Sequence, residues 1–411
     1  MACGSGADSA APAGGPRGVA LVPDTQTVDG VLEMRHPADA LARAPEWMLD
    51  SVPMVVIDGG EAFDLTSVYT PVPLSGGRFA VLRNIGGAQL VLFGTDGKPE
   101  RVLARTGAGP GELVRPTQPV LVGGDTLLVV DDANGSVNWI HPDAGLIRTA
   151  RSTGDGLSGC FGGTGQLADG RLVGVGNCGH NQTDRDGTPR VGTPLLRHTP
   201  DFSESDTIAL VPGYRMGTME IRQGSRRFDV QQPLRFGQFT TVTALDSTIV
   251  VASGEGGYVL RLMDPEGRPT GRIVIPVAAR LVTDALKQLA IDRELKEFRE
   301  RSGSGEQRAI TDEESRRQIV EAPTADTLPA YGRVLPGADG VFWVVDYVLP
   351  SDTTWAATGF RVDGTIVGRL VGPRRGDQLG IGPVWFGRDR VMVREVDEDG
   401  VVRFGVYGVR H

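Results

Sequence analysis

Internal repetition constrains the fold of this chain more strongly than any other feature. Six segments share one pattern: a Gly or Asp turn, a run rich in Val and Leu, a polar turn, a second run and, after a further turn, a third run. The first runs begin at or near Gly77, Asp125, Gly170, Ser247, Gly340 and Asp389. Runs of this kind are typical of β-strands that are buried on both faces.

The turns between the runs favour strand hairpins. Asp96-Gly97, Asp363-Gly364 and Asp399-Gly400 place a glycine where a tight hairpin requires a positive φ. Where nothing is inserted, the turns recur about every 45 residues, a spacing that fits blades of four antiparallel strands. We therefore predict an all-β fold, a six-bladed β-propeller.

Composition agrees with this prediction and excludes other classes. The 58 Gly and 27 Pro among 411 residues interrupt the chain too often for a helical bundle, and 40% hydrophobic residues exceed what a disordered chain contains. The net charge is −9 and no long basic run occurs, which argues against a nucleic-acid partner.

We divide the chain into a flexible N-terminal tether over 1–17, an N-terminal extension over 18–52, and the propeller over 53–411. The last repeat lacks a clear fourth strand, and the apolar segment 54–57 has no repeat of its own. We expect this segment to complete the sixth blade, since pairing there removes an open sheet edge.

A small helical insertion over 282–321 interrupts the repeats between blades four and five. It holds 18 charged residues in 40, against 23% in the whole chain. Thr283 is a good N-cap, and we predict helices near 284–300 and 312–321. The insertion either decorates one face of the propeller or serves as a lid or docking element. Segments 180–193 and 212–237 are long and polar, and we predict loops there.

One Gly-rich stretch links this chain to a known group of proteins. Arg105-Thr106-Gly107-Ala108-Gly109-Pro110-Gly111-Glu112-Leu113, followed by Arg115-Pro116, resembles the connection between blades in six-bladed propellers of the NHL and TolB-like type. Thr327-Leu328-Pro329-Ala330-Tyr331 also matches that group. The resemblance implies an exported bacterial lipoprotein and leaves the activity open, because propellers host unrelated functions.

The three cysteines bear on location and redox state. Cys3, preceded by a small residue and followed by a flexible stretch, looks like the lipidated start of a mature bacterial lipoprotein. Stable attachment would need more than one acyl chain, which such a modification provides. Cys160 and Cys178 can pair as a disulfide if the chain is exported; the alternative is two buried free thiols.

The innermost strands of a propeller line a central channel, and ligands bind at its mouth. We expect these strands near 67–74, 116–122, 161–167, 238–244, 331–335 and 379–384. Convergent polar groups in a concavity mark a binding site. The candidate channel-mouth residues are Tyr69, Arg115, Gln118, Gln238, Tyr331 and Arg333.

These observations favour a binding protein over an enzyme. Lactonase-like propellers hold a channel metal with Glu, Asn and Asp, whereas the inner strands predicted here supply no acidic residue. No His or Cys spacing predicts a zinc site, and we expect no cofactor or metal. We predict a monomeric, non-catalytic propeller that is held at the bacterial envelope only by its lipid anchor. Its partner would be an envelope protein or a small polar ligand. The alternative is a propeller hydrolase or lyase with a metal in the channel.

Overall fold

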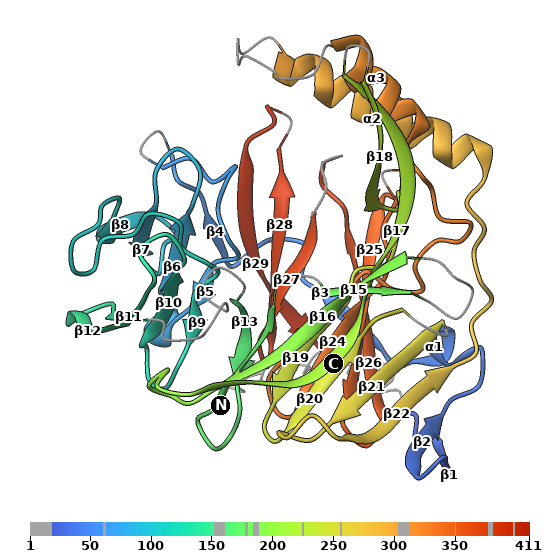
Figure 1. Ribbon diagram of the computed structural model, residues 1–411. Helices are drawn as coiled ribbons and strands as arrows, with labels where there is room; N and C mark the ends of the chain where they lie inside the picture. The colour runs from blue at the N-terminus through green and yellow to red at the C-terminus, as the bar shows by residue number, and fades with distance from the viewer. Residues whose placement is uncertain are drawn as a thin grey trace, which may run out of the picture.

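The computed structural model consists mainly of small antiparallel sheets, an arrangement consistent with a β-propeller (Figure 1). The residues it describes are 19–60, 63–151, 161–176, 180–183, 189–223, 226–254, 257–302, 312–349, 351–376, 381–397 and 399–411. Cys3, Cys160, Cys178 and the tether over 1–17 therefore lie outside the described residues. No helix in the described ranges is long and apolar enough to cross a membrane.

The first half of the repeats forms three units, each with four strands paired antiparallel in chain order. The three units are β5 (Val72–Pro73), β6 (Phe79–Arg83), β7 (Gln89–Phe93) and β8 (Pro99–Arg105); β9 (Val120–Leu121), β10 (Leu127–Asp131), β11 (Ser136–His141) and β12 (Gly145–Arg151); and β13 (Phe161–Gln166), β14 (Leu172–Gly176), β16 (Pro189–His198) and β17 (Ser205–Gln223). A short strand, β15 (His180–Thr183), pairs with β16 in the third unit.

The second half repeats this pairing. The units are β19 (Thr241–Leu245), β20 (Thr248–Ala252), β21 (Tyr258–Met263) and β22 (Pro269–Ile275); β23 (Arg333–Pro336), β24 (Val341–Val345), β25 (Thr354–Arg361) and β26 (Ile366–Pro373); and β27 (Gly382–Phe386), β28 (Arg390–Val396), β29 (Val402–Arg410) and β4 (Val55–Ile57). The predicted inner-strand segments contain or overlap the first strand of each unit.

The apolar runs form these strands because each unit buries both faces against its neighbours. All five residues of β10 and of β24 are buried. Gly97, Gly364 and Gly400 have φ near +80° in the hairpin turns, as the sequence predicts.

The hydrophobic core consists of clusters that join neighbouring units. One cluster joins the first unit to the sixth and contains Val81, Met392 and Phe404. Each of the other five clusters joins two units that are consecutive in the chain: the first and second, the second and third, and likewise up to the fifth and sixth. Every unit therefore packs against two others, and the last packs against the first.

Segment 54–57 pairs with the last repeat, as predicted. Strand β4 lies antiparallel to β29, with Ile57 opposite Phe404 and Val55 opposite Val406. The beginning of the repeat region thus supplies the outermost strand of the last unit and covers the edge of β29 over residues 404–406.

The N-terminal extension covers further sheet edges. Strands β1 (Asp24–Val28) and β2 (Val31–Arg35) form an antiparallel hairpin, and β2 pairs with β22 in parallel. After the short helix α1 (Ala40–Arg43), β3 (Glu46–Leu49) pairs with both β26 and β29. A Cβ on Gly368 of β26 would lie 2.2 Å from Nε1 of Trp47. A glycine is therefore needed at this position of β26, where the Trp47 side chain of β3 packs against the strand.

The helical insertion is close to the prediction. Helix α2 (Asp284–Ser302) follows Thr283, whose hydroxyl accepts a hydrogen bond from the N–H of Leu286 at 3.3 Å. Helix α3 (Asp312–Glu321) begins and ends where the sequence predicts. In Figure 1 both helices lie at one end of the molecule, beside a long two-stranded arm.

The prediction of loops over 180–193 and 212–237 is wrong. Residues 180–183 form β15, and β17 continues to Gln223 and pairs with β18 (Arg226–Pro233) to make the arm. The N–H of Arg222 donates to Glu314 of α3 at 2.9 Å, and Arg317 of α3 donates to the carbonyl of Glu220 at 2.7 Å. These polar strands are stabilised by the helices rather than by the apolar core, so they lack the apolar runs of the other strands.

Candidate functional site

Of the six residues predicted at the channel mouth, three lie where the first two units meet: Tyr69, Arg115 and Gln118. The hydroxyl of Tyr69 donates to the carbonyl of Pro116 at 3.0 Å, and Nε2 of Gln118 donates to the carbonyl of Thr70 at 3.0 Å. Both side chains thus bond to backbone across the boundary between units, while Arg115 is exposed.

Arg333 is the first residue of β23, and Tyr331 lies two residues before it. Tyr331 is fully buried; its hydroxyl donates to the carbonyl of Val259 and accepts from the N–H of Gly254, both at 2.9 Å. Burial raises the pKa of its hydroxyl to about 12. Burial and the neighbouring Arg394 lower the pKa of Arg333 to about 10, and its guanidinium donates to the carbonyl of Pro383.

Among the six residues, Gln238 alone lines a large cavity that the described residues form. This cavity has a volume of about 1040 Å³ and lies between the fourth and fifth units. Three groups of residues form its walls. They are residues of the units themselves (Ser253, Gly254, Gly257, Tyr258, Asp346–Val348, Ser351–Ala356, Arg369, Val371), the two chain segments that lead to and from the helices (Val277–Arg280, Ala325, Thr327–Ala330), and the base of the arm together with α1 (Arg215, Leu234, Phe236–Gln238, Leu41).

The segments that lead to and from the helices form a neck, which we define as 277–283 and 322–330. The N–H of Val282 donates to the carbonyl of Asp326, and the N–H of Leu328 donates to the carbonyl of Arg280. Arg235 of the arm bonds through its backbone to Pro323 and Ala325 of the neck. Neck, arm base and helices are therefore hydrogen-bonded together at one wall of the cavity.

Arg235 also joins the arm to α2. Its side chain is 6% exposed and makes two bonds to the carboxylate of Glu294, at 2.8 and 2.7 Å. Arg222 is 2.8 Å and Arg227 is 3.8 Å from the carboxylate of Glu220. Arginines on the arm are thus engaged with acidic residues of the insertion or of the arm itself.

Two residues that contribute to the cavity wall each carry a buried polar atom that lacks a partner in the described part of the chain. The atoms are the hydroxyl of Tyr258 and Nε1 of Trp355; each residue is 1% exposed, so both atoms lie behind the cavity surface. Oε1 of Gln238 is a third such atom. Burial, with a smaller effect of Asp346, raises the pKa of the Tyr258 hydroxyl well above its usual value. Unpaired buried polar groups are rare because each costs about 1–3 kcal/mol.

Charged side chains complete the wall. Asp346 forms an ion pair with Arg369, which also donates to the hydroxyl of Thr358 at 2.7 Å. Arg280 contacts the carbonyl oxygens of Pro329 at 3.3 Å and Tyr347 at 3.5 Å, so it joins the neck to the fifth unit. Burial raises the pKa of Tyr347, and the charge of Arg280 opposes this shift.

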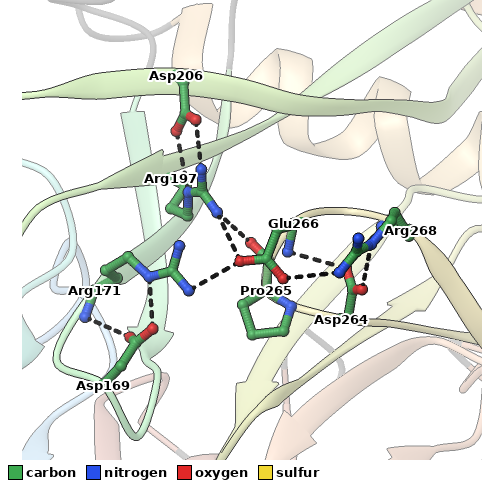
Figure 2. Close-up of polar contacts among 8 residues, drawn as sticks. All are labelled: Asp169, Arg171, Arg197, Asp206, Asp264, Pro265, Glu266 and Arg268. Atoms are coloured by element: carbon green, nitrogen blue, oxygen red, sulfur yellow. Dashed lines mark hydrogen bonds and ion pairs between the residues drawn. The ribbon is translucent and has the colours of Figure 1, made fainter.

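A smaller hollow of about 270 Å³ lies beside the turn between β16 and β17. Its arginines belong to a network between the third and fourth units (Figure 2). Glu266 accepts from Arg171 at 3.2 Å and from Arg197 at 3.4 Å, and Arg197 also pairs with Asp206 at 2.6 Å. Since these charges already have partners, the network joins two units and is a poor candidate for ligand binding.

The Gly-rich stretch 105–113 is a compact connection between the first and second units. The N–H of Gly107 donates to the carbonyl of Leu113, and the N–H of Leu113 donates to the carbonyl of Arg105. Asp131, fully buried at the end of β10, accepts from the N–H groups of Val114 at 2.7 Å and Arg115 at 2.9 Å and from the side chain of Asn134 at 2.9 Å. The motif thus has a structural role, and it lies outside the cavity wall.

Sequence reasoning missed most of the cavity. Tyr258, Asp346 and Trp355 lie in or directly after apolar runs, where they resemble core residues. The available signal was the insertion itself, because its two ends must come together at one place on the propeller. Within the described residues, no group of three or more His, Cys, Asp or Glu side chains could hold a metal ion.

No family model and no curated protein matches this chain. Among solved structures, it is similar to a Bacteroides fragilis protein thought to be exported, at 12% identity and a TM-score of 0.45, covering 92% of this chain and 99% of that one. It is similar to a gluconolactonase of Xanthomonas campestris at 12% identity and a TM-score of 0.42, covering 96% and 98%. A third similarity is to virginiamycin B lyase of Staphylococcus aureus, at 9% identity and a TM-score of 0.40, covering 84% and 95%. All three TM-scores lie below 0.5, so these similarities say nothing about the ligand or reaction of this chain.

Proposed function

We propose that this chain is a six-bladed propeller of the NHL and TolB-like type, and that it binds a small polar ligand without transforming it. The binding site is the cavity between the fourth and fifth units. The observation that carries this proposal is the cavity of about 1040 Å³ itself, whose wall combines polar side chains such as Arg280 and Gln238 with aliphatic ones such as Leu234 and Val371. A cavity of this size, lined by apolar side chains and a few polar groups, is typical of sites that bind small ligands.

The cyclic packing of the units supports the blade count. Each of the six core clusters joins two neighbouring units, and one of them joins the last to the first. The insertion then has a functional role beyond decoration, because its neck forms part of the cavity wall. We propose that neck, helices and arm together act as the lid of this site.

The location is proposed from the N-terminus. Acylation of Cys3 would hold a monomer at the bacterial envelope, where an envelope protein is the alternative to a small ligand as partner. The intact mass of the protein from the membrane fraction tests this, since each acyl chain adds a defined mass. An unmodified mass would remove the lipid anchor from the proposal. A stoichiometric divalent ion in purified protein would instead favour the metal-dependent hydrolase or lyase.

Binding in the cavity is tested by obstructing it. Val371 lines the cavity on the outer strand β26 and is 42% exposed, so Val371→Trp fills space without overpacking the core. Val102→Trp is the matched control, because Val102 is 49% exposed on the outer strand β8, outside the cavity wall. A fragment library that contains neutral, anionic and cationic compounds is screened by thermal shift. We expect compounds that stabilise the wild type and the control but not Val371→Trp; equal stabilisation of all three proteins would contradict the proposed site.

A further inference from the structure

We infer that the ligand of this cavity is a small zwitterion with an apolar body. Such a molecule carries a carboxylate and an ammonium group, as an apolar amino acid or a short apolar peptide does. The inference rests on the proposed function and adds the chemical class. Two side chains of opposite charge lead to it, because both line the cavity and neither has an ionic partner in the described part of the chain.

Five charged residues line the cavity, and three of them already have partners. Asp346 and Arg369 form an ion pair with each other. Arg215 also has a partner. The remaining two are Arg280 of the neck and Asp352 of the connection between β24 and β25. The wall therefore holds one positive and one negative group that a ligand can neutralise.

The guanidinium of Arg280 has donors to spare. Arg280 is exposed, and its side chain contacts the carbonyl oxygens of Pro329 at 3.3 Å and Tyr347 at 3.5 Å, which are long hydrogen bonds. No carboxylate within the described ranges pairs with it. An arginine presents five N–H donors in a planar fork that matches a carboxylate. Arg280 can therefore bind the carboxylate of a ligand.

Asp352 uses one carboxylate oxygen to hold a turn. Its Oδ2 accepts from the N–H of Leu349 at 2.7 Å, and Oδ1 has no hydrogen-bond partner among the described residues. Arg374 contacts the backbone carbonyl of Asp352, at 3.4 Å, and does not pair with its carboxylate. Ser351 and Thr353, its neighbours in the sequence, are exposed and also line the cavity. Since an ammonium group donates three hydrogen bonds, Oδ1 and these two hydroxyl groups suit it.

The two charges are close enough for one small molecule to reach both. Arg280 contacts the carbonyl of Tyr347, and Asp352 accepts from Leu349, two residues further along the same segment. Because two residues of chain span at most about 7 Å, the guanidinium and the carboxylate lie within about 13 Å of each other. They do not pair with each other in the described structure. An extended dipeptide spans about 7 Å, and a hydrogen bond of about 3 Å at each end lets it reach both groups.

The rest of the wall favours an apolar body between the two charges. Aliphatic side chains line the cavity from α1, the arm base, the neck and the fifth unit: Leu41, Leu234, Val277, Leu328, Val348 and Val371. A zwitterion without an apolar body, such as diglycine, would leave these side chains in contact with water. A leucine-type side chain would cover them.

The test uses four probes that share one body: Leu-Leu, N-acetyl-Leu-Leu, Leu-Leu-amide and N-acetyl-Leu-Leu-amide. Binding is measured by isothermal titration calorimetry at pH 7 and constant ionic strength. Because hydrogen bonds between charged groups are the stronger ones, we expect Leu-Leu to bind about tenfold more tightly than either singly blocked form. The doubly blocked form and diglycine should bind more weakly still. If either singly blocked form binds as tightly as Leu-Leu, the assignment of a zwitterion is overturned.

The same comparison with leucine, N-acetyl-leucine and leucine amide distinguishes the two sources of this chemistry. Tighter binding of leucine than of Leu-Leu, with the same loss on blocking either end, identifies a free amino acid. Tighter binding of Leu-Leu identifies a peptide.

Variants assign each end of the ligand to its partner. Arg280→Gln should weaken Leu-Leu and N-acetyl-Leu-Leu about tenfold and leave Leu-Leu-amide unchanged, because the amide has no carboxylate. Asp352→Asn keeps an oxygen for the N–H of Leu349; it should weaken Leu-Leu and Leu-Leu-amide and leave N-acetyl-Leu-Leu unchanged. Equal loss for all four probes, or no loss for Leu-Leu in either variant, would contradict the inference.

Matched controls remove the same charges elsewhere. Arg388→Gln and Asp389→Asn change side chains that are 75% and 64% exposed in the turn between β27 and β28, outside the cavity wall. Both should bind all four probes as the wild type does. A loss of Leu-Leu binding in these controls equal to that in the cavity variants would show that the effect comes from net charge and would overturn the assignment.

The two proposals fail differently. If other fragments bind in a way that Val371→Trp abolishes while neither leucine nor Leu-Leu binds, the cavity is a ligand site and the zwitterion assignment is wrong. If no compound of any charge depends on Val371, the proposed function itself fails.

Discussion

Two neighbouring tyrosines allow a sharp test of the cavity wall. Tyr258 and Tyr331 are 1% and 0% exposed, and their rings meet edge to face with centroids 5.1 Å apart. They differ in their hydroxyl groups. Tyr331 makes two hydrogen bonds of 2.9 Å, to Val259 and Gly254, whereas the hydroxyl of Tyr258 has no partner in the described structure.

Replacing each tyrosine by phenylalanine keeps the ring packing and removes one oxygen. Tyr331→Phe leaves the carbonyl of Val259 and the N–H of Gly254 unpaired, and should lower the free energy of unfolding by about 2–3 kcal/mol. Tyr258→Phe removes a buried hydroxyl that lacks a bond. It should leave the free energy of unfolding unchanged or raise it by up to about 1 kcal/mol.

The assay is urea unfolding of wild type and both variants, with the midpoint shift converted through a common slope. A change in slope would show that the variant alters the surface exposed on unfolding, and thermal midpoints then give the ranking. If Tyr258→Phe costs as much as Tyr331→Phe, the Tyr258 hydroxyl is already satisfied inside the protein, and this account of the cavity wall is refuted.

Three further predictions concern the framework. Burial lowers the pKa of His198 to about 4, against an ordinary value of 6.5. Between these two pH values the unfolded chain binds a proton that the folded chain does not. The free energy of unfolding, measured by urea unfolding at each pH, should therefore fall by up to about 3 kcal/mol from pH 7 to pH 4. Asp131→Ala should cost about 3 kcal/mol in the same assay, because it removes three hydrogen bonds to a buried carboxylate. Gly368→Ala should loosen β3, since its Cβ would lie 2.2 Å from Trp47, and limited proteolysis should cut the N-terminal extension sooner.

Each of these has a control. His198→Gln should flatten the pH dependence and His141→Gln should not; the opposite result would assign the dependence to another group. For Asp131, a loss below about 1 kcal/mol would mean that its hydrogen bonds contribute little to stability. Gly368→Ala should become harmless in a Trp47→Ala background, and persistent sensitivity to protease would show that the clash is not the cause.

The sequence predicted the repeating elements well because they follow local rules. The apolar runs predicted the strands, and Gly97, Gly364 and Gly400 predicted the turns. The pairing of 54–57 with the last repeat is a long-range contact, and it was predictable because an unpaired edge at the end of a ring needs a partner. Thr283 predicted the start of α2 because a threonine hydroxyl before a helix can accept a hydrogen bond from an N–H of the first turn, as it does here from Leu286.

The candidate site was predicted less well, for a physical reason. Tyr258 and Trp355 occupy strand positions and are buried like core residues, so only three-dimensional placement reveals that their polar atoms lack partners. The arm over 212–237 was mistaken for loops because its strands pack on charged helices. Arg333 and Tyr331 were expected together at a channel mouth, and the hydroxyl of Tyr331 instead bonds to the backbone of the fourth unit.

The most direct test of the ligand site is a crystal structure of the protein soaked with the fragments that stabilise it. We predict electron density for a bound fragment in the cavity between the fourth and fifth units, with a polar atom within hydrogen-bond distance of the Arg280 guanidinium. Density beside Arg333 in place of the cavity would contradict this assignment and return the site to the centre of the ring.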